Sequence, residues 1–482
     1  MLQQNSMSPT SLTPDNTLFV VVSFEGPDPY SQAGGLGVRV SGLVQALADQ
    51  DYQTHLFFIG DPNLPGEEAT RGGRLVLHRW AQWISANCPA GVYEGEPGKV
   101  ADVTASLPAY LVDRILAPAI AVGRIPVLLF EEWQTAECAC RISNALTAMG
   151  IRDRAVLYWN ANNPYGFERI NWLSLAAATT ITTISRHMRS IIRSCGADAR
   201  VIPNGIPDAS FEPVARTDVA QLRAAFNERP GSGFLFKMAR WEREKGWTQA
   251  LDAISHTRAQ ESTPESGRSR ALVLIGRGGG PTGAGGRLAE DAESRGLRVV
   301  SFDSESAFLA GLSEGIRAAA DVVSLRFGVT SSLARTLYAA SDGVLANSVS
   351  EPFGLVGLEA MAAGGVAFTG GTGEDYAVGG RNAVVLETLD PAEIVARWSE
   401  LASSPELAAR LRRAARRTAR EYEWRTIVAI LLQSLSQQAR RQGLLQPEPP
   451  RAMVTGDRER RRGVYRDGIS FVSTTIEREP TV

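Results

Sequence analysis

The sequence predicts an α/β protein with two doubly wound parallel sheets that face a central cleft. Apolar runs of strand length alternate with helical patterns, which is typical of parallel sheets covered by helices. The alternation ends at 201–206 ("VIPNGI") and begins again at 233, so it occurs twice. A chain of 482 residues also exceeds one compact core. We therefore expect two domains, residues 17–215 and residues 216–415.

The first domain is predicted to begin with a strand at 17–24 ("TLFVVVSF"). This run is apolar almost throughout, as expected for a strand that is buried on both faces. A helix at 38–50 follows it. The remaining strands of this domain are expected at 54–60, 127–132, 155–160 and 179–185.

The second domain is predicted to repeat this pattern. Its strands are expected at 233–240, 271–276, 297–302, 321–325, 342–348 and 365–370. A helix at 246–254 should follow the first of these strands. Another helix, at 355–363, should follow the fifth and stop at the two glycines after it. The region 405–436 is also predicted to be helical.

Three segments lie outside the two predicted domains. Residues 1–16 form a polar tail, and 416–440 is expected to be a helix that packs back on the first domain. The tail 441–482 is rich in Pro, Arg and Glu, which favours a solvated appendage. A docked hairpin at 463–476 is the alternative.

Charge and composition exclude several classes of protein. The formal net charge is -2, which does not fit the basic surface of a nucleic-acid binder. The start is polar and lacks the order of a signal peptide, and no apolar run reaches the length of about 18 to 20 residues that a membrane span needs. We therefore expect no transmembrane segment. The chain has only three lysines, and all its other basic residues except four histidines are arginines.

Cysteine usage indicates a reducing compartment. The four cysteines form no CxxC pair and are too sparse for a disulfide framework in a chain of this length. A cytoplasmic location is therefore predicted. The cysteines are Cys88, Cys138, Cys140 and Cys195.

The stretch "SEPFGLVGLEAMAAGG" (350–365) places one acid inside an apolar helix. From 355 to 363, Glu359 is the only polar side chain. Because an unpaired buried carboxylate is costly, Glu359 should meet donors, and a ribose diol offers two hydroxyls. The alternative is an ordinary surface glutamate.

The loop before this helix adds further candidates. Glu351 follows the predicted strand 342–348, and in open parallel sheets ligands lie beyond the carboxyl ends of strands. The free N–H groups of a helix start favour an anion or electron-rich oxygens. Backbone groups at Phe353, Gly354 and Leu355 are therefore predicted to contact a sugar.

Two cations follow the first strand of the second domain, in "FKMARWEREKGW" (236–247). Arg240 ends this strand and Lys245 precedes the next helix, so both should project towards the cleft. A guanidinium and an ammonium together can stabilise a leaving diphosphate. The alternative is a solvated loop in which they pair with Glu242 and Glu244.

A glycine-rich loop, "SQAGGLGVRVSG" (31–42), follows the first strand of the first domain. Gly34 and Gly35 permit close approach of backbone to phosphate oxygens. A dinucleotide fingerprint fails here because Val40 stands where the last glycine should be. Asp61, after the second strand, leaves a nicotinamide-binding protein as an open alternative. We found no Walker A, H-E-x-x-H or G-x-S-x-G motif, and no metal site or cofactor is predicted.

Taken together, these residues resemble a known family. Glu351 and Glu359 match the E-x7-E motif of retaining glycosyltransferases with the GT-B fold, which consists of two Rossmann-like domains. The resemblance is to glycosyltransferase family four and to glycogen synthase-like enzymes. "ARWEREKG" resembles their Arg-Lys diphosphate clamp and "AGGLG" resembles the glycine loop of glycogen and starch synthases. The similarity extends from about Leu18 to Leu432.

The resemblance implies a role for each matched residue. Glu359 would hold the ribose hydroxyls, while Glu351 and the backbone at 353–355 would contact the donor sugar. Arg240 and Lys245 would bind the diphosphate, opposite Gly34 and Gly35. The expected reaction transfers a hexosyl group from a nucleoside diphosphate sugar to a hydroxyl acceptor, with retention and without a metal.

Two positions depart from the glycogen synthase pattern. Glu132 lies where those enzymes carry a D-W-H run, in "FEEWQTAE". Asn162 stands in place of a histidine, which keeps an amide near the sugar but removes a titrating group. Both are retained as catalytic candidates, and glycogen synthesis itself is disfavoured.

The acceptor is not identified by the sequence. Aromatic residues of the first domain are candidate platforms for sugar rings, and core packing is the alternative for most of them. They are Trp80, Trp83, Tyr93, Trp133, Trp159, Tyr165 and Phe167. Two other functions remain open: an epimerase or hydrolase of the same fold, and a non-catalytic protein that binds nucleotide sugars.

Overall fold

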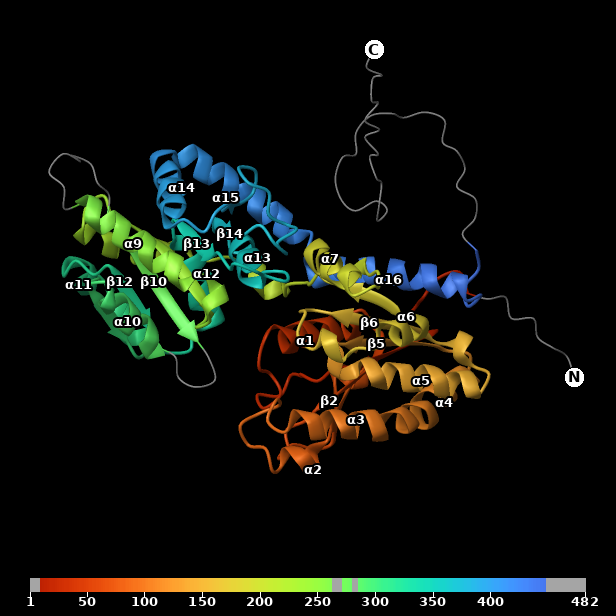
Figure 1. Cartoon of the computed structure of the whole chain (residues 1–482). Coiled ribbons are helices and arrows are strands. Elements are labelled where there is room, and N and C mark those ends of the chain that lie inside the picture. Colours follow the sequence, from red (N-terminus) through yellow and green to blue (C-terminus); the bar gives the residue numbers. More distant parts are fainter. Residues whose placement is uncertain (1–8, 262–270, 280–284, 448–482) are drawn as a thin grey trace, which may run out of the picture.

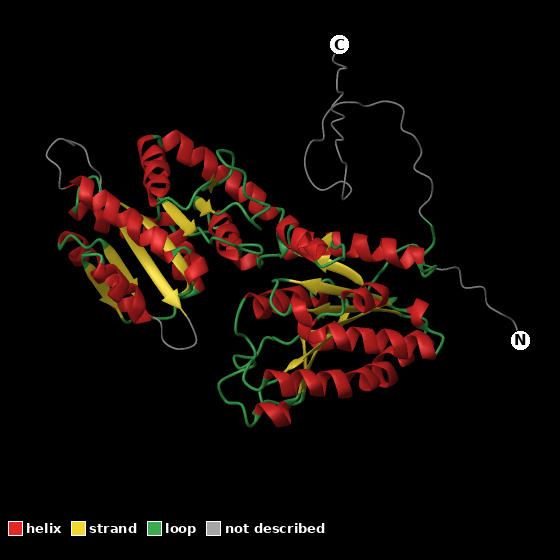
Figure 2. Cartoon of the chain, viewed as in Figure 1, coloured by secondary structure: helices red, strands yellow, loops and turns green. Residues whose placement is uncertain are grey.

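The computed structural model describes residues 9–261, 271–279 and 285–447, and contains two α/β domains (Figure 1). Each is a mainly parallel sheet with helices packed on its faces (Figure 2). The predicted fold class is confirmed. The hairpin considered at 463–476 lies outside the described residues.

The sheet of the first domain has the order β3-β4-β2-β1-β5-β6-β7-β8. All neighbouring strands are parallel except β3 and β4. β1 is central and all its residues are buried, as its apolar sequence predicts. The strands are β1 (Thr17–Val22), β2 (Gln53–Ile59), β3 (Glu67–Thr70), β4 (Leu75–Trp80), β5 (Ile125–Glu131), β6 (Val156–Ala161), β7 (Thr180–Thr183) and β8 (Arg200–Val201).

The sequence analysis did not predict β3, β4 and most helices of this domain. Only the helix after β1 was expected, and it begins earlier than predicted, at Gly35. The helices are α1 (Gly35–Ala48), α2 (Gln82–Ser85), α3 (Glu96–Leu111), α4 (Ala117–Ala121), α5 (Ala136–Ala148), α6 (Trp172–Ala178) and α7 (Arg186–Ser194).

One helical stretch bears on the expectation that the chain has no transmembrane segment. From Glu96 to Ala121 the helix is continuous, and it is long and apolar enough to cross a membrane by length and composition alone. Buried core helices pass the same test. Here Val103, Leu107 and Leu111 are buried within the domain core, and α3 packs against α5.

The sheet of the second domain has the order β11-β12-β10-β9-β13-β14-β15, and its neighbouring strands are parallel. All six strands that the sequence predicts are present, with each end within three residues of the expected one, and β15 was not predicted. The strands are β9 (Gly233–Arg240), β10 (Leu272–Gly279), β11 (Val299–Phe302), β12 (Val322–Leu325), β13 (Gly343–Ala346), β14 (Ala367–Thr369) and β15 (Val384–Val385).

Helices cover this sheet and enclose two apolar clusters. One cluster contains Trp247 and Trp398, and the other contains Phe308 and Tyr338. The helices are α8 (Arg216–Ala224), α9 (Trp247–Glu261), α10 (Gly285–Ser294), α11 (Glu305–Arg317), α12 (Ser331–Ala340), α13 (Leu355–Ala362), α14 (Pro391–Ser403) and α15 (Pro405–Arg420).

The last helix, α16 (Trp424–Arg441), lies on the first domain beside α1 (Figure 1). Tyr158 donates a hydrogen bond from its hydroxyl to the carbonyl of Ser434, at 2.9 Å. The predicted start of this helix at 416 falls inside α15. The break lies instead at 421–423, where the Ile206 N–H donates to the carbonyl of Tyr422 at 2.8 Å. The chain therefore crosses between the domains along two adjacent segments.

Close packing around Trp424 fixes the place where the chain returns to the first domain at the start of α16. A Cβ atom added at Gly42 or at Gly205 would overlap the ring of Trp424. Trp424 is buried in the same apolar cluster as the first domain's core. Glycine at these two positions thus allows α1 and the 201–206 segment to contact the first turn of α16.

A buried histidine pair should make the first domain sensitive to acid. His55 Nδ1 and His78 Nε2 lie 2.9 Å apart, and burial lowers the pKa of each to about 4. Because the unfolded chain binds protons near pH 6.5, the free energy of unfolding should fall as pH drops from about 6.5 through 4. The expected loss is on the order of 2 to 4 kcal/mol for the pair.

Urea unfolding at several pH values measures this loss. The double variant His55→Gln/His78→Gln should show a shallower decline than the native chain, while His256→Gln, at an exposed histidine, should not. An equal decline in all three proteins would contradict the assignment.

Candidate active site

The loop between β13 and α13 forms one side of the candidate site, and its conformation depends on Gly354. This residue caps α13 with a φ of 82°, a region that favours glycine. A Cβ here would lie 2.8 Å from Cγ of Glu374. The carbonyl of Gly354 accepts a hydrogen bond from the hydroxyl of Tyr376. The start of α13 is therefore held in place by Tyr376, and the first-turn N–H groups lie at the loop that forms the candidate site.

Glu359 lies in the second turn of α13. Among the described residues its side chain has one hydrogen-bond partner, Tyr338, whose hydroxyl donates to Oε2 at 3.5 Å, the outer limit of a hydrogen bond. The side chain is partly exposed, yet shielding of the carboxyl raises its pKa to about 7. An ordinary surface glutamate would not be shielded in this way. The ribose contact remains a prediction.

Lys245 and Glu351 form an ion pair at the candidate site. Lys245 Nζ is 2.8 Å from Glu351 Oε2, and the two side chains are only 18% and 19% exposed. The backbone N–H of Glu351 donates to Thr372 Oγ1 at 2.9 Å, which fixes the loop. Lys245 therefore pairs across the edge of the sheet with the first acid of the E-x7-E motif, and its partner is not Glu244.

Arg240 differs from the expectation. Its side chain is 57% exposed and pairs with Glu242 at 3.0 Å, which is the solvated alternative considered for this loop. The backbone of Arg240 is nevertheless fixed, because its carbonyl accepts from Trp247 Nε1 at 2.9 Å. Arg240 thus stands at the end of β9 without facing Glu351.

Glu374, which was not among the predicted site residues, belongs to this group. It is buried, its Oε1 has no hydrogen-bond partner in the described chain, and its Oε2 accepts from the N–H of Thr372 at 3.2 Å. Burial raises its pKa to about 7, and the charge of Glu351 adds to this shift. The position could have been found, because Glu374 follows β14 in the same way that Glu351 follows β13.

The glycine loop of the first domain is already filled by a carboxylate. Glu25 Oε2 accepts from the backbone N–H groups of Ala33, Gly34 and Gly37 at 2.9 to 3.1 Å. Its Oε1 accepts from the hydroxyl of Tyr93. The N–H of Gly34 is therefore not free for a phosphate in this structure, whereas no such bond is formed by Gly35. Glu25 follows the first strand and was missed.

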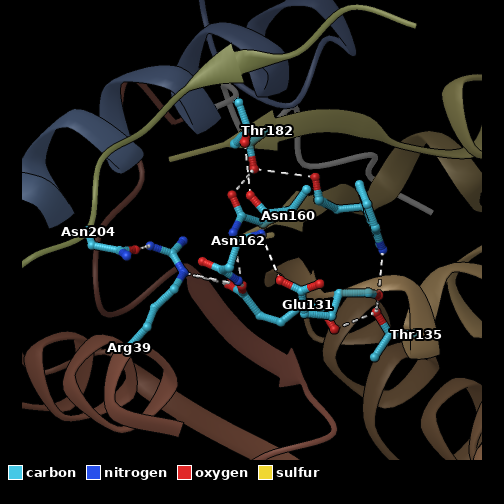
Figure 3. Close-up of polar contacts among 11 residues, drawn as sticks. Arg39, Glu131, Thr135, Asn160, Asn162, Thr182 and Asn204 are labelled. Carbon is cyan, nitrogen blue, oxygen red and sulfur yellow. Dashed lines mark hydrogen bonds and ion pairs between the residues drawn. The ribbon is translucent and has the colours of Figure 1, made fainter. Parts of the chain in front are cut away.

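A buried polar network lies at the ends of β5 and β6 (Figure 3). Glu131 pairs with Arg39 of α1 at 3.2 Å. Its Oε2 also accepts from Asn160 Nδ2 at 2.9 Å and from Asn162 Nδ2 at 2.8 Å. Arg39 in turn donates to Asn204, next to the first crossing. Asn162 is thereby oriented, and its Oδ1 is left buried without a hydrogen-bond partner among the described residues.

Glu132 is strained and buried beside this network. Its φ is 68°, which is unusual for a residue with a side chain. Its Oε1 accepts from the N–H of Asn162 at 2.7 Å, while Oε2 has no partner in the described part of the chain. Burial, assisted by the charge of Glu131, raises its pKa to about 8. Glu132 and Asn162, which were both predicted as catalytic candidates, are therefore in direct contact.

The candidate acceptor aromatics separate into two groups. Trp159 and Phe167 are buried core residues, and Trp80 packs on Tyr110 with its Nε1 bonded to Ser106. The exposed members are Trp83, Tyr93 and Tyr165.

Trp133 is partly exposed and contacts both an aromatic ring and a cation. Its ring lies 6.5 Å from that of Tyr165, and the guanidinium of Arg169 is 4.5 Å from it. It also lines a groove of about 440 Å³ between α3 and α5.

One ion pair joins the domains beside the site. Asp375, next to Glu374, accepts from Arg186 Nε at 3.0 Å and from the Arg186 backbone N–H at 2.8 Å. Arg186 begins α7 of the first domain. Within the described ranges no group of three or more His, Cys, Asp or Glu could hold a metal ion.

Residues 317–418 match a family model described as "Glycosyl transferases group 1". This segment includes β13, α13 and both acids of the E-x7-E motif. No curated protein sequence matches the chain closely enough to count as a relative.

Solved structures share the fold over nearly the whole described chain. A sucrose-phosphate synthase from Thermosynechococcus elongatus is 17% identical, with a TM-score of 0.59, over 87% of this chain and 98% of its own. The catalytic domain of starch synthase IV from Arabidopsis thaliana, bound to ADP and acarbose, is 16% identical, with a TM-score of 0.59, over 88% and 99%. A glycosyltransferase from Rickettsia africae is 11% identical, with a TM-score of 0.61, over 88% and 99%. The two domains therefore have the GT-B architecture, and the second contains the segment that matches the group 1 glycosyltransferase model.

The buried acid Glu132 in the first domain should make the free energy of unfolding depend on pH. Because Glu132 keeps its proton up to about pH 8 in the fold but loses it near pH 4.5 when unfolded, the free energy of unfolding should fall as pH rises between these values. Glu132→Gln should reduce this fall by on the order of 3 to 5 kcal/mol.

Chemical unfolding from pH 5 to pH 9 measures the effect, and Glu137→Gln, at an exposed glutamate on α5, is the control. A pH dependence in Glu132→Gln equal to that of the native chain would show that Glu132 is ionised in the fold.

Proposed function

We propose that this chain is a glycosyltransferase that moves a hexosyl group from a nucleoside diphosphate sugar to a hydroxyl acceptor, with retention and without a metal. The observation that carries this proposal is the convergence of Lys245, Glu351 and Glu374 at the N-terminus of α13, with Glu359 one turn further along the helix. The ammonium of Lys245 would bind the diphosphate of a nucleotide sugar. The helix terminus with Glu351 would bind its sugar, and Glu359 would bind its ribose. The resemblance of the E-x7-E motif supports membership of glycosyltransferase family four.

The proposed reaction uses these groups in a definite way. The bond between the sugar's anomeric carbon and the diphosphate oxygen breaks, and the acceptor oxygen bonds to that carbon from the same face. The acceptor's proton passes to the departing phosphate. Lys245 would stabilise the charge that develops on the diphosphate, while the N–H groups at the start of α13 and Glu351 hold the sugar.

The first domain would supply the acceptor side. Glu132 and Asn162 each have a buried oxygen without a hydrogen-bond partner in the described part of the chain, and Trp133 and Tyr165 are close to them in sequence. A hydroxyl could donate to Asn162 Oδ1 and accept from the protonated Glu132 carboxyl, and the rings could pack on a sugar face. Closure of the domains would bring this side against the donor.

Arg240 would take part only after a rotamer change. In the structure it pairs with an exposed glutamate, an interaction of about 0 to 1 kcal/mol that a diphosphate could replace. The glycine loop would contribute through Gly35, because Glu25 occupies the N–H of Gly34.

Turnover distinguishes the proposal from its alternatives. Thermal-shift screening with UDP-, GDP- and ADP-glucose identifies a donor, and release of nucleoside diphosphate is then measured with and without saccharide acceptors. Acceptor-dependent release is expected. Release without an acceptor would indicate a hydrolase, binding without release a non-catalytic protein, and stabilisation by NAD alone a nicotinamide enzyme. A cytoplasmic location is proposed on the cysteine usage.

Lys245→Ala should weaken donor binding by about 2 to 4 kcal/mol, because it removes a largely buried ammonium that would contact the diphosphate. Calorimetry with the best nucleoside diphosphate measures the change. Arg243→Ala is the matched control, since Arg243 is an exposed cation in the same turn. Equal affinities for the native protein and Lys245→Ala would remove Lys245 from the site.

Glu359→Gln should weaken binding of the free nucleoside diphosphate by roughly tenfold, because the amide offers one acceptor oxygen where the carboxylate offers two. The same calorimetry tests it, with Glu406→Gln, at an exposed glutamate of α15, as control. A defect confined to sugar transfer would show that Glu359 contacts another part of the substrate.

A further inference from the structure

Lys237 is a buried charge that the proposed reaction does not use. It lies on the central strand β9, opposite Gly276 of β10, and is only 1% exposed. Its Nζ donates to Asn347 Oδ1 at 2.6 Å and to the carbonyl of Leu345 at 3.3 Å. It also lies 5.2 Å from the ring of Trp247. No carboxylate of the described residues lies within ion-pair distance of this ammonium. A buried lysine without such a partner is unusual and costly.

The hydrogen bonds of Lys237 lead directly to the turn that carries Lys245. Asn347 accepts from Lys237 and donates from Nδ2 to the carbonyl of Gly246 at 3.1 Å. Gly246 has a φ of 67°, and a Cβ there would overlap the carbonyl of Asn347. The turn 243–246 is therefore seated on Asn347, whose amide is oriented by Lys237.

Few charges face Lys237. Lys245, from the turn after β9, and Glu351, from the loop after β13, are the groups whose charges act on it. The other neighbours are uncharged: β10 presents Gly276, β13 presents a backbone carbonyl, and α9 presents an indole. Burial first, and then the charge of Lys245, lower the pKa of Lys237 to about 7, against the opposing effect of Glu351. In the unliganded site the ammonium is thus easily lost near neutral pH.

We propose that Lys237 is a positioning residue for the donor diphosphate, and that it takes up a proton when the diphosphate binds at Lys245. The inference rests on the proposed function and goes beyond it by adding a proton to the binding equilibrium. A bound diphosphate adds negative charge beside Lys245 and so favours the charged form of Lys237. The ammonium then donates a charge-assisted hydrogen bond to Asn347, which holds the turn in place. Affinity should therefore decrease as pH rises above 7.

Titration calorimetry tests the linkage in the full chain. UDP, GDP or ADP, whichever gives the largest thermal shift, is titrated at pH 7.5 in two buffers with different ionisation enthalpies, so that the difference in heat counts protons. We expect uptake of roughly half a proton. Glu359 and Glu374 also titrate near pH 7, so variants must separate their contributions.

Three variants make the assignment specific. Lys237→Met keeps a side chain of similar volume without a charge, and it should abolish most of the proton uptake and weaken binding severalfold. Asn347→Asp places a carboxylate within hydrogen-bond distance of Lys237 Nζ. Lys237 should then stay charged with and without nucleotide, so this variant should also abolish the proton uptake. Lys99→Met removes the other fully buried lysine, which bonds Tyr30 and backbone carbonyls in the first domain, and should leave the uptake unchanged.

The outcomes separate this inference from the proposed function. Uptake that persists in both Lys237→Met and Asn347→Asp would overturn the inference while leaving a nucleotide-binding enzyme intact. Failure of all three nucleoside diphosphates to bind the native chain would overturn both. Should Lys237→Met not fold, Asn347→Asp and Lys237→Arg, whose guanidinium stays charged, carry the same test.

Discussion

The ion pair between Lys245 and Glu351 is the interaction on which the candidate site depends. It joins the turn after β9 to the loop after β13, two neighbouring strands whose carboxyl ends meet at one edge of the sheet. Most of both side chains is withdrawn from water, so the pair is screened less than a surface pair would be. It holds the cation and the acid in register before any substrate arrives. A diphosphate that engages Lys245 must compete with Glu351 or share the ammonium with it.

The acids around this pair form a set with shared behaviour. Glu359 and Glu374 are both shielded, and both have pKa values raised to about 7. Carboxyls held near neutrality can accept or donate hydrogen bonds to sugar and ribose hydroxyls as needed. Such shifted groups gather at functional sites more often than elsewhere, which supports the assignment of this edge as the donor side.

The helix N-termini near the candidate site differ between the two domains in whether a carboxylate occupies them. In the second domain the N-terminus of α13 faces the site, and among the described residues no carboxylate caps it. In the first domain Glu25 accepts from three N–H groups at the start of α1 and fills the place of an anion. In the proposed function, the charge of a donor would therefore be matched mainly by the second domain. The first offers one acid with a raised pKa, Glu132, together with amides and aromatic rings, which would suit an uncharged hydroxyl acceptor.

The sequence by itself determined the two-domain fold, and it predicted the position of the donor side. Apolar strands buried on both faces cannot be mistaken for solvated segments, and Glu359 stood out because no neighbour in its helix was polar. Periodicity missed β3, β4 and most helices of the first domain, whose patterns are mixed. Only the tertiary structure decided which charges meet. It paired Lys245 with Glu351, turned Arg240 to Glu242, placed Glu25 on the glycine loop and brought Glu374 beside Gly354. These pairings join residues that are distant in sequence, or choose between equal partners in one loop, and spacing along the chain carries no information about either.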